Sequence, residues 1–287
     1  MNEAQATPAR DEPGRGAGSG MAGGAGAGPG AGTNGPGAER PAPVVPAEPE
    51  PDPAQSAPRA LTDAATGVVA ALALVILVST ASARSWIIDP HLTLVLSYLA
   101  VWVPLLAAVF AACYLHGTRS LRRDLGLWFQ PLDLLWGLAV GLLARMVASL
   151  IEIAGYGQMG QAAASFGETV YDFWWLFGAL LAPVLLAPLV EELFFRGVVL
   201  RAVTGVTQQS GASRRVAVIL GIVVSALVFA LVHIITIQQA DAALVVGLST
   251  FVFGLGAATI AATTGRLGGA LVAHVTFNAL VVLPALF

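Results

Sequence analysis

Apolar runs alternate with short polar connections from residue 61 onward, and each run has roughly 20 residues, the length that an α-helix needs to cross a membrane. At about 1.5 Å per residue, such a helix spans about 30 Å of hydrocarbon. The pattern predicts an all-α polytopic membrane bundle of seven transmembrane helices, within a range of six to eight. The predicted helices cover residues 64–83, 92–115, 132–154, 173–196, 216–237, 242–263 and 267–286.

Residues 1–60 do not follow this pattern. Gly, Ala and Pro dominate the segment, charges are scattered, and large apolar side chains are almost absent. A chain of this composition cannot bury a hydrophobic core. We therefore expect a disordered tail over residues 1–60, followed by the first two transmembrane helices over residues 61–118.

Composition narrows the class of protein. Hydrophobic residues make up 56% of the chain and charged residues 11%, which is typical of an integral membrane protein. The formal net charge of -3 excludes a strongly basic nucleic-acid binder. A single cysteine, Cys113, excludes an internal disulfide and a metal site built from cysteines.

The arginines predict the orientation. Only Arg84 lies in the connections after the first, third and fifth predicted helices, whereas seven arginines lie in the others: Arg119, Arg122, Arg123, Arg201, Arg214, Arg215 and Arg266. The positive-inside rule places these Arg-rich connections and the N-terminal tail in the cytoplasm, with the C-terminus outside a plasma membrane. If one run were a pair of half-helices, only the side of the C-terminus would change.

Ionisable side chains inside the predicted helices are candidates for function, because each costs at least about 2.5 to 3.5 kcal/mol at membrane depth. They include Arg145, Glu152, Glu191, Glu192, Arg196, His233 and His274, and Asn278 is a polar companion. His91 and His116 lie in connections, where we expect solvated loop residues.

Helical spacing assigns these side chains to faces. Glu192 and Arg196 are four residues apart, so they share a face and are predicted to pair. Glu191 is rotated by about 100° and has no partner on its own helix. His274 and Asn278 are likewise four residues apart.

Depth decides whether the candidates on different helices can meet. Phe229 lies one turn before His233 on the fifth predicted helix. If residues 202–220 are partly interfacial, then His233, Glu191 and His274 fall in one layer, nearer the cytoplasmic face.

These residue types allow three interpretations. In the first, Glu191 is a general base that activates water, while His274 and Asn278 stabilise an oxyanion. In the second, Glu191, His233 and His274 bind zinc and leave a fourth position for water. In the third, Glu192 and Arg196 are a packing ion pair and the histidines and Asn278 are hydrogen bonds between helices.

Three short stretches contain most of these residues and follow one another along the chain: EELFFR (Glu191 to Arg196), FALVH (Phe229 to His233) and HVTFN (His274 to Asn278). They resemble the EExxxR, FxxxH and HxxxN motifs of the CAAX protease and bacteriocin-processing (CPBP, or Abi) family of intramembrane endopeptidases. The resemblance runs roughly from Ser120 to the C-terminus, so residues 119–287 are expected to form a CPBP-type protease domain.

The resemblance implies a polar cavity that is open toward the cytoplasm and in which Glu191 activates water. His233 positions that water, and His274 and Asn278 form the oxyanion site. The residues implied to support them are Glu192, Arg196 and Phe229. We prefer a glutamate mechanism that requires no cofactor, with zinc as the alternative.

The implied substrate is a membrane-tethered or hydrophobic peptide or protein, met at the lipid bilayer, and no nucleic acid is expected. Eukaryotic members of the family cut prenylated CAAX proteins, but an Arg-only, Ala- and Gly-rich chain is typical of prokaryotes, so prenylation is not expected. Two alternatives stay open. They are a catalytically silent scaffold or immunity protein of the same family, and a small proton-coupled transporter.

Overall fold

The structure is a computed structural model that describes residues 53–160 and 172–285. Residues 49–287 form one compact unit. The expectation of a disordered tail over residues 1–60 lies outside the described residues for 1–52 and is wrong for 53–60, which are helical.

Every regular element in the described residues is helical, which confirms the all-α prediction. Six helical stretches there are long and apolar enough to cross a membrane, and a shorter apolar helix, Gly268–Pro284, follows them. The chain is thus a multi-pass membrane protein by helix length and hydropathy. The elements are α1 (Pro53–Ala83), α2 (Pro90–Phe110), η1 (Ala111–Leu115), α3 (Leu121–Asp124), α4 (Pro131–Tyr156), α5 (Phe173–Trp175), η2 (Leu176–Leu186), α6 (Ala187–Glu191), η3 (Glu192–Val199), α7 (Leu200–Gln209), α8 (Arg214–Ile234), α9 (Ala240–Thr264) and α10 (Gly268–Ala285), where η marks a π-helical segment.

Local chemistry fixes several helix ends. The Asp89 carboxylate accepts a hydrogen bond from the Leu92 backbone N–H at the start of α2, and the Ser213 hydroxyl accepts one from Val216 at the start of α8. Gly157 and Gly265 end α4 and α9 in the left-handed region, with φ of 75° and 69°, where glycine has no steric penalty.

The fourth apolar run continues past its predicted end at Arg196. The helical stretch runs from Phe173 to Gln209 and consists of α5, η2, α6, η3 and α7. The hydrophobic pattern stopped at Arg196 because an arginine commonly ends a membrane span. In the structure this arginine is fully buried instead, and the next one, Arg201, donates to the Gly265 carbonyl at 2.9 Å.

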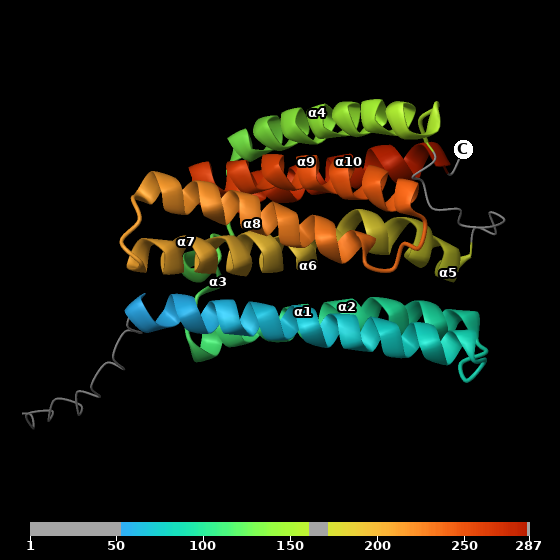
Figure 1. Cartoon of the computed structure of the whole chain (residues 1–287), viewed down its shortest axis with the longest axis horizontal. Helices are drawn as coiled ribbons and strands as arrows, with labels where there is room; N and C mark the ends of the chain where they lie inside the picture. The colour runs from blue at the N-terminus through green and yellow to red at the C-terminus, as the bar shows by residue number, and fades with distance from the viewer. Residues whose placement is uncertain (1–52, 161–171, 286–287) are drawn as a thin grey trace, which may run out of the picture. The chain divides into compact units, whose positions relative to one another are not determined.

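Residues 202–220 are largely helical, because they comprise most of α7 and the first turns of α8. Gly221 on α8 lies directly against Thr204 on α7, so the two helices form a close hairpin. In Figure 1 this hairpin projects beyond the nearby end of α9. If this hairpin lies partly at the membrane interface, His233 lies at the depth expected from the sequence. The interfacial location itself stays a prediction.

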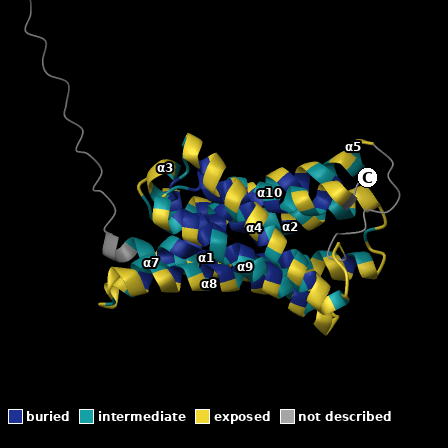
Figure 2. Cartoon of the chain, turned by 90° about the horizontal axis from the view of Figure 1, so that it is seen from above, coloured by how far each residue is buried: buried dark blue, intermediate teal, exposed yellow. Residues whose placement is uncertain are grey.

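The helices pack in close pairs, in which α1 lies on α2, α8 on α9, and α10 on α4 and α9. Gly137 and Gly141 leave no room for a Cβ between α4 and α10, so these two backbones approach closely. Figure 2 shows buried residues along the contacts between helices and exposed residues around the outside. Many of the exposed side chains are large and apolar, as expected for a surface that faces lipid.

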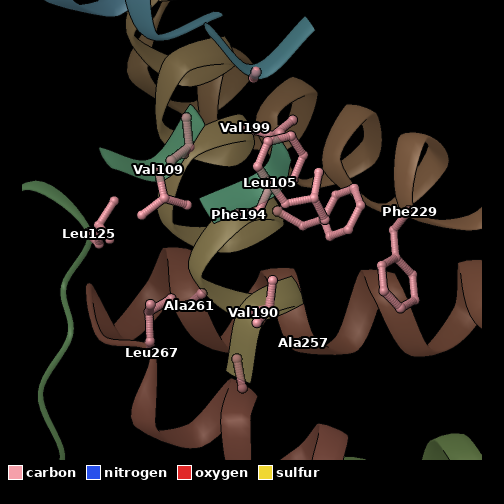
Figure 3. Close-up of a cluster of buried hydrophobic side chains, with 14 of the residues drawn as sticks. Leu105, Val109, Leu125, Val190, Phe194, Val199, Phe229, Ala257, Ala261 and Leu267 are labelled. Carbon is pink, nitrogen blue, oxygen red and sulfur yellow. The ribbon is translucent and has the colours of Figure 1, made fainter. Parts of the chain in front are cut away.

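One buried cluster joins most of the helices at the level of the candidate residues. Phe194 on η3 lies at its centre with Leu105 and Val109 from α2, and Phe229 from α8 lies at its edge (Figure 3). Ala257 and other small side chains of α9 complete the cluster. The helix that carries Glu191 is therefore held from several sides.

Two prolines interrupt the hydrogen bonding of this helix. In the π-helical η2 each carbonyl is bonded five residues ahead, as the bond from Ala187 N–H to the Ala182 carbonyl shows. Proline has no N–H, so Pro183 and Pro188 free the carbonyls of Gly178 and Pro183, respectively.

Side chains from two other helices cap the freed carbonyls. The Tyr98 hydroxyl on α2 donates to the Gly178 carbonyl at 3.1 Å, and Asn278 Nδ2 on α10 donates to the Pro183 carbonyl at 2.8 Å. The segment before Glu191 is thus tied to α2 and to α10.

Ion pairs complete the fold. Arg145 and Glu152 pair at 2.8 Å within α4, and Glu152 also accepts from the Gly160 N–H at 2.6 Å. His116 Nδ1 lies 2.7 Å from Asp63 on α1. The expectation that His116 is a solvated loop residue is therefore wrong, because a residue far away in sequence supplies its partner.

Candidate active site

Four elements carry the candidate residues. Glu191 is the last residue of α6, and Glu192 and Arg196 lie in η3. His233 is close to the end of α8, and His274 lies in the second turn of α10. The structure brings all five side chains together, as the following contacts show.

Glu191 faces both histidines. Its Oε2 atom lies 3.6 Å from His274 Nε2 and 3.9 Å from His233 Nε2. Both distances are too long for a direct hydrogen bond, and a water lying beside the three atoms could hydrogen-bond to more than one of them. The expectation that these three side chains share one layer agrees with this arrangement.

The partners of the two rings determine their tautomers. His233 Nδ1 lies 2.7 Å from the Phe229 carbonyl, and a carbonyl can only accept, so Nδ1 carries the hydrogen. His274 Nδ1 lies 2.7 Å from Glu192 Oε1, and the same argument applies to a carboxylate. When each ring is neutral, its Nε2 lone pair points toward Glu191.

Glu192 connects Arg196 with His274. Its Oε1 accepts from Arg196 Nη1 at 2.9 Å as well as from the His274 ring, and the Glu192 and Arg196 side chains are both fully buried. This confirms the predicted Glu192–Arg196 pair. The carboxylate therefore sets the orientation of the ring that faces Glu191.

Aromatic rings surround the buried guanidinium. Arg196 Cζ lies 4.5 Å from the centroid of the Phe229 ring and 5.6 Å from that of Phe253, distances at which a cation is attracted by the ring face. Arg196 Nη2 also donates to the Gly254 carbonyl at 3.4 Å. The charge is thus balanced by Glu192 and enclosed on its other sides.

Asn278 makes its hydrogen bond to a different partner. Its carboxamide donates to the Pro183 carbonyl and lines a cavity of about 160 Å³ together with Arg145, Glu152 and Ser249. An Asn carboxamide has two N–H hydrogens, so the bond to Pro183 leaves a second one for another acceptor. The structure therefore shows Asn278 first of all as a cap of the helix that carries Glu191.

A cavity of about 220 Å³ opens beside Glu191 and His233. Phe195 and Val232 line it on the same side, and Thr236 adds a hydroxyl. The opposite wall is apolar and comes from α1 and α2, through Val68, Ala71, Leu72, Val75, Val101 and Leu105.

Zinc would require Glu191, His233 and His274 as ligands. The donor types suit zinc, and both rings donate Nδ1–H to an oxygen, as metal-binding histidines usually do. In the part of the chain that the structure describes, however, no three His, Cys, Asp or Glu side chains are arranged to hold a metal ion. Zinc therefore stays an alternative prediction, and the mechanism below contains no step through a metal.

Sequence reasoning missed Phe253 and the wall from α1. The Phe253 ring is fully buried with its centroid 4.6 Å from that of His274, so it helps to fix the plane of that ring. Phe253 lies in an apolar run without charged neighbours, which offers no signal. The α1 residues form a stripe with helical spacing, and a periodicity analysis could have identified the stripe but not its partner.

Residues 173–280 match the family model described as Type II CAAX prenyl endopeptidase Rce1-like. The match includes all three short stretches that hold the candidate residues. It lies inside the expected domain of residues 119–287 and leaves out α1, α2 and α4. No curated protein and no solved structure matches the chain.

Proposed function

Residues 173–280 are a domain of the Rce1-like type II CAAX prenyl endopeptidase family, and on this premise we propose that the chain is an intramembrane endopeptidase. The family implies a CAAX-type protease that acts on protein substrates. The finer proposal is hydrolysis of peptide bonds by water that Glu191 activates.

One observation carries the proposal. The Glu191 carboxylate faces Nε2 of both His233 and His274 at 3.9 and 3.6 Å, so a water lying beside these atoms can hydrogen-bond to more than one of them. Three groups that can accept or donate a proton therefore lie within reach of one water. The cavity beside Glu191 gives a peptide access to that position.

Hydrolysis can proceed with these groups alone. Glu191 takes a proton from the water, and the oxygen attacks the carbonyl carbon of the scissile bond. The tetrahedral intermediate then collapses as the carbon–nitrogen bond breaks, and the proton held by Glu191 passes to the leaving amine. His233 orients the water through Nε2, because its Nδ1–H is fixed on the Phe229 carbonyl.

The oxyanion of the intermediate needs hydrogen-bond donors. A protonated His274 ring donates from Nε2, and Glu192 balances that charge at Nδ1. We assign the second donor to the remaining N–H of Asn278. Arg196 keeps Glu192 in place and has no direct part in the reaction.

We propose a membrane-tethered or hydrophobic peptide or protein as the substrate. We further propose that the Arg-rich connections lie on the cytoplasmic side, so that the substrate reaches Glu191 from there. The reaction needs no cofactor in this proposal.

The test compares Glu191→Gln with the wild-type protein on a library of membrane-tethered peptides, with cleavage followed by mass spectrometry. The amide keeps the shape of the side chain but cannot serve as a general base, so we expect no cleavage with an unchanged unfolding temperature.

Asp241→Asn is the matched control, because it makes the same chemical change at an exposed position at the start of α9. It should cleave like the wild type. Cleavage at the wild-type rate by Glu191→Gln would refute the proposed role of Glu191, and absence of cleavage by the wild type across the library would count against protease function.

A further inference from the structure

The cavity beside Glu191 has polar groups on one side only. Glu191, His233 and Thr236 supply its polar groups. The facing wall belongs to α1 and α2, which lie outside the segment matched by the family model. The apolar wall of the site therefore comes from helices outside the matched segment.

The α1 wall is a stripe with helical spacing. Val68, Leu72 and Val75 are partly buried and Ala71 is 7% exposed, whereas Val69 and Ile76 beside them are 66% and 62% exposed. Only one face of α1 thus reaches the cavity. Neighbouring residues on the other face provide natural controls.

Two close approaches hold this wall in position. A Cβ at Gly67 on α1 would lie 2.8 Å from the Ala108 Cβ on α2 and 3.4 Å from Phe194 on η3. A Cβ at Gly205 on α7 would lie 2.7 Å from the Ala57 Cβ near the start of α1. Because the backbones are this close, the side chains of the stripe determine how much space remains.

The size and chemistry of the cavity limit its ligand. A cavity of about 150 Å³ holds one benzene molecule, so the 220 Å³ here suit one apolar side chain of the size of Leu or Phe. A prenyl chain has far more carbon atoms than benzene, so it would extend beyond the cavity. A charged side chain would lose its hydration against the six apolar side chains of α1 and α2.

We propose that α1 and α2 form a side-chain subsite that selects protein substrates with one unmodified, medium-sized apolar residue next to the scissile bond. The inference rests on the proposed peptidase function, and it adds the substrate class and the residues that select it. Leu72 and Val75 limit the width of the subsite, and Ala71 limits its depth.

The first experiment uses the full-length wild-type protein in liposomes and one membrane-tethered peptide whose cleavage site is known from mass spectrometry. The residues on either side of the scissile bond are changed in turn to Ala, Leu, Phe, Trp and Asp. One missing methylene in an apolar pocket lowers kcat/KM by about 10- to 200-fold. At one of the two positions beside the scissile bond, kcat/KM for the Leu peptide should therefore exceed that for the Ala peptide by at least about tenfold. Asp should be rejected, and a prenylated form of the best peptide should be cleaved no faster.

The second experiment changes the wall. Leu72→Ala widens the subsite, so the ratio of kcat/KM for the Trp peptide to that for the Leu peptide should rise about tenfold or more. Ala71→Phe fills the subsite and should reverse the preference toward Ala. Ile76→Ala and Val69→Ala are the matched controls and should keep the wild-type ratios.

The outcomes separate the two proposals. Cleavage that depends on Glu191 but is indifferent to the side chain, or equal ratios for Leu72→Ala and Ile76→Ala, would overturn the subsite and leave the peptidase standing. A large gain from prenylation would overturn the substrate class. If the wild type cleaves no peptide, both proposals fall. If Ala71→Phe does not fold, Leu72→Ala still decides the question.

Discussion

Asn278 has one role that the structure shows and one that we propose for the reaction, and Asn278→Ala tests whether it has both. In the structure its carboxamide caps the Pro183 carbonyl, which Pro188 leaves without a partner. In the reaction its second N–H would bind the oxyanion. Loss of the cap affects stability, whereas loss of the oxyanion donor affects the rate.

The two effects differ in size and in kind. An uncapped buried carbonyl lowers the free energy of unfolding by about 1–3 kcal/mol. Removing one oxyanion donor lowers kcat by about 10² to 10³, with substrate binding little changed. We therefore expect Asn278→Ala to lower both the unfolding temperature and kcat, and to leave KM nearly unchanged.

Tyr98→Phe is the matched control for the structural part. It removes the hydrogen bond to the Gly178 carbonyl, which Pro183 frees in the same helix. This carbonyl lies more than three turns before Glu191. Its effect on stability should resemble that of Asn278→Ala, and its kcat should stay within a few-fold of the wild type.

The assay combines thermal unfolding in detergent with cleavage kinetics in liposomes. If Asn278→Ala retains the kcat of Tyr98→Phe, then Asn278 is a cap and the oxyanion assignment is wrong. If Tyr98→Phe loses kcat as strongly as Asn278→Ala, the rate responds to the position of the helix. Neither result would affect the assignment of Glu191.

Two further predictions concern the groups around Glu191. Arg196→Leu leaves the fully buried Glu192 without its ion-pair partner, so the free energy of unfolding should fall by about 3 to 5 kcal/mol, and a wild-type unfolding temperature would contradict this. A chelator should not change the cleavage rate; loss of stoichiometric zinc together with activity, and recovery of both on adding metal, would replace the proposed mechanism with the zinc alternative.

Contacts between residues close in sequence could be predicted well. Apolar runs identified the membrane-crossing helices, and a spacing of four residues identified the Glu192–Arg196 pair. Both depend on the geometry of a single helix, which the sequence encodes directly. The end of the fourth run was harder, because Arg196 is polar in sequence and buried in the structure.

Contacts between different helices could not be predicted from the sequence in the same way. The His274–Glu192 hydrogen bond depends on the relative rotation and height of two helices, which no local pattern specifies. The Asn278 bond to Pro183 was missed for a related reason, because it follows from a carbonyl freed by a proline in a π-helical segment. The motif order indicated that the three helices meet, but not which atoms face each other.

The pairing of the two arginines inside the apolar helices bears on how the protein enters the membrane. Arg145 pairs with Glu152 two turns later on the same helix, and Arg196 pairs with Glu192 one turn earlier on its own helix. A guanidinium that reaches hydrocarbon alone is strongly unfavourable. Since each of these helices brings its own counter-ion, it can leave the translocon electrically neutral in that region, before any neighbouring helix has been synthesised.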